Sequence, residues 1–296
     1  MSEFLQQLLN GLSLGASYAL IALGYTMVYG VLRFINFAHA DVFMVGAFIG
    51  YYMGQRLPQG TIWGGLIVLT VAMAGCALLG MLIERLAYRR LRGGPTLNVL
   101  ITAIGVSLLL EYSGQVFFGA APRTFPAVFP VSTFHLGPVV VSTNQVIVIV
   151  VAVLLMVALE LIVYRTKMGT AMRAVALNPK AAQLVGINND VVISFTFGLG
   201  SALAAAGGIL YALNYPSIDP MMGVMPGLKA FVAAILGGIG NIPGAALGGL
   251  ILGTVETFIG GSQWSTYKDA IAFAILITIL LFRPAGLLGK FTVEKV

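Results

Sequence analysis

Long apolar runs separated by short polar connections dominate the sequence. These runs lie at residues 5–30, 38–56, 62–84, 96–116, 144–164, 191–212, 226–260 and 267–282. Most are close to the roughly 20 residues that an α-helix needs to cross a bilayer. The pattern predicts an all-α fold, a polytopic helical membrane protein with about eight membrane segments. We expect residues 1–296 to form a single transmembrane domain.

Two of the apolar runs contain breaks. The run 226–260 is too long for one ordinary span, and it contains glycines and a proline between Gly237 and Gly244. Glycine and proline clusters interrupt helices. This run is therefore either two short spans or a re-entrant hairpin, and the sequence leaves both open. Residues 33–41 interrupt the first stretch of the chain in the same way, so we expect broken or re-entrant helices at both places.

Small residues recur at intervals of four within several runs. Gly11 and Gly15 form one such pair, and Gly249 and Gly253 form another. This spacing lets helix backbones approach closely in lipid. It indicates a tightly packed bundle and says little about function.

Composition agrees with a membrane environment. Apolar residues make up 59% of the chain and charged residues only 9%, whereas a soluble domain carries roughly 25% charged residues. An ordinary water-soluble enzyme and a disordered chain are both excluded by these values. The net charge of +6 is small and spread along the chain. We therefore expect the lipid bilayer, and no nucleic acid, among the partners.

Basic residues predict how the chain is oriented in the membrane. Most of the 16 Lys and Arg residues fall in three connections, which hold Arg85, Arg89, Arg90 and Arg92, then Arg165, Lys167, Arg173 and Lys180, then Arg283, Lys290 and Lys295. Cytoplasmic loops carry the excess of basic residues in membrane proteins. These three connections are therefore expected in the cytoplasm. The N-terminus lies outside if both early runs cross, and inside if one of them only dips into the membrane.

The connection 165–190 has the signals of a short capped helix. Asn178 suits the N-cap, Pro179 the first helical position and Gly186 the position just past the end. An apolar face lies between these signals, at Ala181, Ala182, Leu184 and Val185. Such a helix can dock in a groove of a partner protein. It can equally lie on the inner leaflet, held by its basic residues.

Three polar residues, Asn36, His39 and Asp41, cluster in the break near residue 38. Polar groups within a membrane are costly and often mark a transport path, so they are candidates for a gate or a path lining. Alternatively, His39 and Asp41 form a pair that caps the following helix, where the helix dipole favours a negative charge. A metal site is not expected, because the other histidine, His135, lies in a distant loop.

A second candidate part of the path is the glycine-rich break, at Gly237, Gly238, Gly240 and Asn241. Such a break can expose backbone groups to a substrate at mid-membrane. It lacks the Lys-Ser/Thr ending of a phosphate-binding loop, so no nucleotide is expected to bind there.

The isolated acidic residues and the remaining polar residues suggest no enzyme. We interpret Glu84 as a charge partner of the neighbouring basic cluster, and Glu111, Glu160 and Glu256 as interfacial residues. Glu111 and Glu256 could alternatively line a path. No nucleophile or paired catalytic carboxylates emerge, and no cofactor is predicted.

Several motifs, in order along nearly the whole chain, resemble the permease subunit of branched-chain amino acid ABC importers of the LivH type. They lie at residues 10–30, 35–41, 169–187, 229–245, 267–269 and 283–289. Ala40 stands where that family often has glycine.

The resemblance implies a membrane-spanning permease subunit of an ATP-driven importer in the bacterial inner membrane. Such a subunit moves branched-chain or other hydrophobic amino acids from the periplasm to the cytoplasm by alternating access. The implied partners are a second homologous permease, two cytoplasmic ATPase subunits and a periplasmic amino-acid-binding protein. The chain itself would not be an enzyme, because ATP hydrolysis is expected in the ATPase subunits.

The resemblance also implies that 165–190 is a cytoplasmic coupling loop. Its implied ATPase-coupling residues are Gly169, Arg173, Asn178, Pro179, Ala182 and Gly186. On this interpretation Ala182→Arg would place a charge in the ATPase groove and abolish transport. A stand-alone channel or ion-coupled carrier is the main alternative, although the scarcity of charges within the spans argues against proton coupling. An ABC permease for urea or short amides also stays open.

Overall fold

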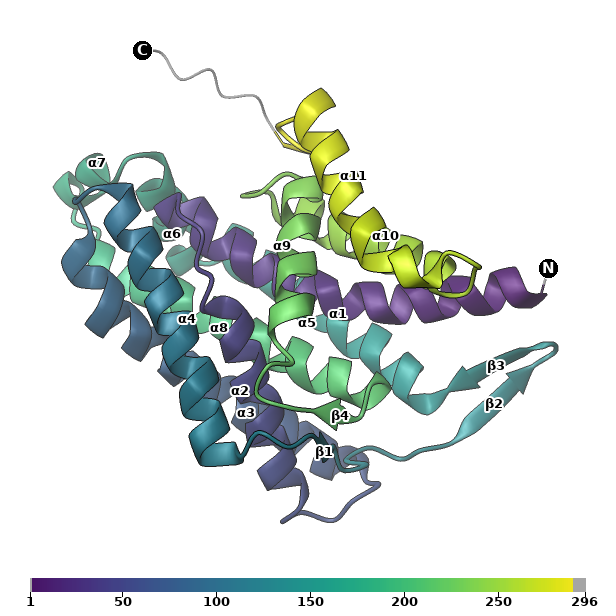
Figure 1. Ribbon diagram of the computed structural model, residues 1–296. Coiled ribbons are helices and arrows are strands. Elements are labelled where there is room, and N and C mark those ends of the chain that lie inside the picture. Colours follow the sequence, from purple (N-terminus) through teal and green to yellow (C-terminus); the bar gives the residue numbers. More distant parts are fainter. Residues whose placement is uncertain (1, 290–296) are drawn as a thin grey trace.

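Helices make up most of the structure, a computed structural model that describes residues 2–289 (Figure 1). The helices are α1 (Ser2–Leu32), α2 (His39–Gly54), α3 (Ile62–Ile83), α4 (Thr96–Phe118), α5 (Thr143–Arg165), α6 (Lys167–Leu177), α7 (Pro179–Leu184), α8 (Asn189–Asn214), α9 (Val224–Gly237), α10 (Ile242–Gly260) and α11 (Lys268–Phe282). A π-helical turn, Glu84–Tyr88, and a 3₁₀ turn, Arg89–Leu91, extend α3, and a second 3₁₀ turn, Ser265–Tyr267, precedes α11. The short strands are β1 (Arg123–Thr124), β2 (Thr133–Leu136), β3 (Val139–Ser142) and β4 (Ser217–Ile218).

The predicted polytopic helical class is confirmed. Among the described residues, seven helices are long and apolar enough to cross a membrane, and α9 is a shorter apolar helix. The run 226–260 divides into α9 and α10, which pack against each other as a hairpin with its turn at residues 238–241. The break between α1 and α2 is also present, and Arg33 adopts a positive φ of 54° there.

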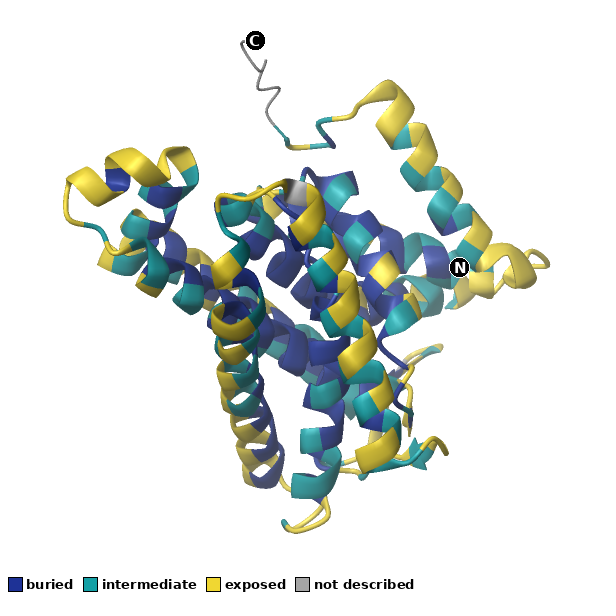
Figure 2. Ribbon diagram, turned by 60° about the vertical axis from the view of Figure 1, so that its left-hand side comes forward, coloured by how far each residue is buried: buried dark blue, intermediate teal, exposed yellow. Residues whose placement is uncertain are grey.

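The helices differ strongly in burial. In α1 and α8, 94% and 83% of the most apolar stretch is buried, against 17% in α4, 22% in α5 and 6% in the stretch that contains α11. Figure 2 shows the buried helices at the centre and the exposed ones around them. Because lipid is itself apolar, an exposed hydrophobic face on the outer helices is the expected arrangement in a membrane. The bundle therefore has α1 and α8 as its core.

Close backbone contact joins α1 to α10. A Cβ atom added to Gly11 would lie 2.7 Å from the Cα of Thr254, and one added to Gly15 would lie 2.8 Å from the Cα of Leu250. As the residue number rises along α1 it falls along α10, so the two helices are antiparallel. The glycine spacing thus confirms the tight packing predicted from the sequence.

The polar connections lie on two opposite faces. On one face, which we call the basic face, Arg92 of the 84–95 connection pairs with Asp190 at the start of α8. On the other face, Gln6 exchanges two hydrogen bonds, of 3.0 and 2.9 Å, with Val140 of the β2–β3 hairpin. The C-terminal end of α2 reaches this second face too, where Gly54 packs against Pro126.

Helix α1 runs from the second face to α6 of the basic face, and α2 returns from the buried break to the second face. With the basic face in the cytoplasm, this arrangement supports the placement of the N-terminus outside, one of the two alternatives that the sequence left open. Arg283 follows α11, whereas Lys290 and Lys295 of the third basic cluster lie outside the described residues.

The α1–α10 contact predicts a selective effect of side-chain size. We expect Gly15→Val to destabilise the protein by about 1–3 kcal/mol, because the added atoms overlap the backbone of α10. The matched control is Gly105→Val on α4, where an added Cβ meets nothing within 4 Å. Thermal unfolding of the purified variants in detergent measures the difference. Equal midpoints for the two variants would contradict the proposed packing.

Candidate functional site

The connection 165–188 forms two short helices on the basic face. The hydroxyl of Thr166 accepts a hydrogen bond of 3.0 Å from the N–H of Gly169 and so caps α6. A Cβ atom at Gly169 would clash with the backbone carbonyl of Val163. Gly169 therefore permits the sharp turn from α5 into α6. Arg173 lies further along α6, with its guanidinium 5.3 Å from the centre of the Tyr164 ring.

Helix α7 has the caps predicted from the sequence. Asn178 accepts hydrogen bonds of 3.0 and 3.1 Å from the N–H groups of residues 180 and 181. Pro179 occupies the first turn, and Gly186 takes a φ of 87° just beyond the helix. The predicted start and end of this helix are thus confirmed. Its role in coupling stays a prediction.

The outward face of this region differs from the one expected. Ala182 is only 3% exposed and points into its own chain. The outward apolar side chains are Leu177, Leu184 and Val185, at 83%, 89% and 76% exposed. The expectation that Ala182 faces a partner groove is therefore wrong, and Ala182→Arg would first disrupt the packing of the loop itself. The direction of a side chain in a helix this short depends on how α7 packs, which the local sequence does not specify.

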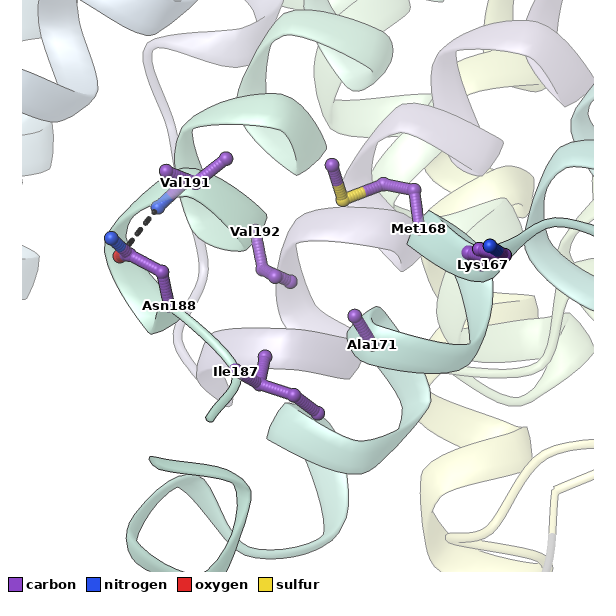
Figure 3. Close-up of a pocket in the computed structure, with 7 residues that line it drawn as sticks. All are labelled: Lys167, Met168, Ala171, Ile187, Asn188, Val191 and Val192. Carbon is purple, nitrogen blue, oxygen red and sulfur yellow. Dashed lines mark hydrogen bonds between the residues drawn. The ribbon is translucent and has the colours of Figure 1, made fainter. Parts of the chain in front are cut away.

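An apolar pocket of about 300 Å³ lies beside these helices. Its lining comes from α6, from the turn after α7 and from the start of α8: Lys167, Met168, Ala171, Ile187, Asn188, Val191 and Val192 (Figure 3). Asn188 is held by hydrogen bonds of 3.1 and 3.3 Å that its side chain accepts from the N–H groups of Asp190 and Val191. The pocket and the three exposed apolar residues form a surface that we call the coupling face.

A network of ion pairs fastens the coupling face to the end of α3. Arg92 donates to Asp190 at 2.7 Å and also to Glu84, while Arg89 pairs with Asp190. Ser194 of α8 donates to Glu84, whose side chain is fully buried. Partial burial lowers the pKa of Arg92 to about 10, so Arg92 remains cationic at neutral pH. The interpretation of Glu84 as a partner of the first basic cluster is confirmed.

The three polar residues of the α1–α2 break are all buried, and each has different surroundings. Asn36 accepts a hydrogen bond of 2.7 Å from the hydroxyl of Tyr88. His39 packs on the ring of Tyr25 at 4.7 Å, and its Nε2 has no hydrogen-bond partner within residues 2–289. Asp41 accepts from Ser107 of α4. The His39–Asp41 pair considered from the sequence is therefore absent, and a role in a gate stays a prediction.

The glycine-rich turn between α9 and α10 holds the segment that follows α11. The carbonyl of Gly237 accepts from the N–H of Leu288 at 3.1 Å, and the side chain of Asn241 donates to the carbonyl of Leu288 at 2.7 Å. Gly238 and Gly240 take φ values of 102° and 93°. A Cβ atom at Gly238 would approach the backbone of the C-terminal segment to 2.5 Å. These groups pack the turn closely, and their place in a transport path stays a prediction.

A buried charge cluster was missed by the sequence analysis. Lys229 of α9 lies 2.6 Å from Glu256 of α10 and 2.6 Å from Asp269 of α11. Tyr18 of α1 donates to Glu256 at 2.9 Å. The interfacial interpretation of Glu256 is wrong, and charges within the spans are less scarce than the sequence suggested. Glu256 follows Gly253 on the helix face that packs against α1, and this spacing was an available signal.

The cluster predicts a large cost for a small change. Glu256→Gln keeps the shape of the side chain but removes the more buried of the two carboxylates that pair with Lys229, and breaking a buried ion pair costs about 3–5 kcal/mol. The control is Glu160→Gln, because Glu160 is exposed. Thermal unfolding in detergent is the measurement. A Glu256→Gln midpoint as high as that of the control would show that the cluster contributes nothing to stability.

Within residues 2–289, no group of three or more His, Cys, Asp or Glu side chains is arranged to hold a metal ion. What the structure does present is a bundle of long apolar helices, with a buried polar break between α1 and α2 and exposed apolar side chains beside the basic connections on one face. These features define a multi-pass helical membrane protein. The sequence matches the protein family described as "Branched-chain amino acid transport system / permease component" over residues 7–280, and the chain belongs to this family.

Relatives with known names agree with this family along the full length. The chain is 43% identical to the high-affinity branched-chain amino acid transport system permease protein BraD of Pseudomonas aeruginosa, over 99% of this chain and 98% of that protein. It is 42% identical to the corresponding permease protein LivH of Escherichia coli K12, with the same coverage. A probable LivH of Methanocaldococcus jannaschii is 31% identical over 91% of this chain and 88% of that protein. The protein is thus a permease component of an ABC transport system and not its ATPase.

Proposed function

We propose that this chain is a permease subunit of an importer that carries leucine, isoleucine or valine across the bacterial inner membrane. In this proposal it works with a second homologous permease, two cytoplasmic ATPase subunits and a periplasmic amino-acid-binding protein. The full-length similarity to permeases of branched-chain amino acid transport supports the substrate class. The coupling face is the observation that supports an ATPase partner. Its large apolar side chains are exposed beside basic residues, and such a surface is more stable in a protein groove than in water.

Contacts between α7 and the start of α8 support transmission of movement from the coupling face into the bundle. The turn after α7 is fixed by a hydrogen bond of 3.0 Å from the N–H of Ile187 to the carbonyl of Ala182. A second bond, of 2.9 Å, runs from the side chain of Asn189 to the carbonyl of Pro179. Because α8 is largely buried against α1, a displacement of α7 by an ATPase would move the centre of the bundle. Alternating access needs such a transfer, because ATP is hydrolysed in the separate ATPase subunits in this proposal.

The candidate path residues are those of the two breaks. Asn36, His39 and Asp41 bring polar groups into the interior at the α1–α2 break, and the turn at Gly237, Gly238, Gly240 and Asn241 forms the α9–α10 break. Helix breaks are the places where backbone and side-chain polar groups become available inside a membrane. We assign the path to the neighbourhood of these breaks.

The coupling face predicts which substitution separates the subunits. We expect Leu184→Glu to weaken retention of the ATPase by about tenfold or more, because a carboxylate would enter an apolar groove at a cost above 1.4 kcal/mol. Co-purification of the ATPase subunits with the tagged permease from detergent-solubilised membranes measures the effect.

The control for this experiment is Val131→Glu, which places the same charge on a side chain that is 63% exposed on the opposite face. This variant should retain the ATPase fully. Full retention by Leu184→Glu, or equal loss in both variants, would contradict docking at the coupling face.

A further inference from the structure

The end of α3 lies between the coupling face and the α1–α2 break. Here the chain forms the π-helical turn Glu84–Tyr88. Such turns are rare and are found frequently at functional sites. Glu84 and Tyr88 stand at its two ends, and their relative exposures are 0% and 1%. Each side chain makes a polar contact in a different direction.

Glu84 connects the turn to the coupling face. It accepts from Arg92 and from Ser194, and Arg92 in turn binds Asp190 at 2.7 Å. Asp190 belongs to the first turn of α8, directly after the capped helix α7. A buried carboxylate that loses its cationic partner is strongly destabilised. A movement of Arg92 and of the start of α8 is therefore expected to displace Glu84 as well.

Tyr88 connects the same turn to the break between α1 and α2. Its hydroxyl donates to Asn36 at 2.7 Å, and its ring lies 5.4 Å from that of Phe34 and 5.5 Å from that of Phe197. The segment 33–38 lies outside both helices, and Arg33 has a φ of 54°, a conformation that is uncommon for residues other than glycine. A segment of this kind can change conformation at a lower cost than the helices beside it.

We propose that the turn Glu84–Tyr88 transmits movement of the coupling face to the α1–α2 break. Tyr88 is the positioning residue at the break, because the hydrogen bond from its hydroxyl fixes Asn36 relative to the end of α3. Displacement of α7 moves Asp190 and Arg92, then Glu84, and finally the segment that carries Asn36 and His39. The inference rests on the proposed function, since an ATPase must supply the displacement. It adds the specific contact through which the membrane path responds.

The test is Tyr88→Phe, which removes one hydroxyl and keeps the ring contacts. The complete transporter in proteoliposomes, with its ATPase, second permease and binding protein, is supplied with ATP and radiolabelled leucine. We expect ATPase retention and ATP hydrolysis to stay near wild type. Leucine uptake per ATP hydrolysed should fall about tenfold, a factor within the usual range of coupling between two sites. The control is Tyr112→Phe, at a position 61% exposed on α4.

A double-variant cycle separates this relay from a general loss of packing. Asn36→Ala should lower uptake per ATP as Tyr88→Phe does, and the combined variant should be no worse than either alone, because all three lose the same contact. Wild-type uptake per ATP in Tyr88→Phe, or losses that multiply in the double variant, would overturn the relay. A wild-type permease that binds no ATPase would instead overturn the proposed function on which the relay rests.

Discussion

The close antiparallel contact between α1 and α10 is the interaction on which the rest of this structure depends. In a bilayer, apolar side chains gain little by leaving lipid, so helices associate through van der Waals contact and through the polar groups that they share. Glycines at positions 11, 15, 249 and 253 bring the two backbones together. That approach buries α1 along most of its length and gives α8 and α9 a rigid partner. It also sets the place where Tyr18 can reach Glu256.

Polar contacts in the interior are concentrated where separate segments of the chain must be fixed relative to one another. The Lys229 cluster joins α9, α10 and α11, and the Glu84 network joins the end of α3 to the start of α8. Each group would be costly in lipid without its partner, so these contacts fix positions more strictly than apolar packing alone. Helix α11, which is otherwise exposed, is held at its two ends by Asp269 and by the segment that bonds to the glycine-rich turn. The same logic makes the Tyr88–Asn36 bond a sensitive point, because it is a short polar contact beside an irregular segment.

The sequence was informative wherever the signal was local. Apolar run length predicted the spans, and Asn178, Pro179 and Gly186 predicted both ends of α7. Contacts between distant residues could not be predicted in this way: Asp41 binds Ser107, 66 positions away, and local sequence patterns carry no sign of such a pairing. The position of Glu256 after Gly253 indicated a packed helix face, but its partners on α1 and α9 could not be identified before those helices were placed beside it. The inward direction of Ala182 was missed for a similar reason, because the buried face of a two-turn helix is defined only when its neighbours are known.

We expect this permease to move substrate only when an ATP-driven partner displaces its coupling face. Uptake of radiolabelled leucine into proteoliposomes tests it most directly. Vesicles holding both permease subunits, ATPase and binding protein should accumulate leucine with ATP, and vesicles lacking only the ATPase should accumulate none, with or without an imposed proton or sodium gradient. Accumulation without the ATPase, driven by either gradient, would contradict the account.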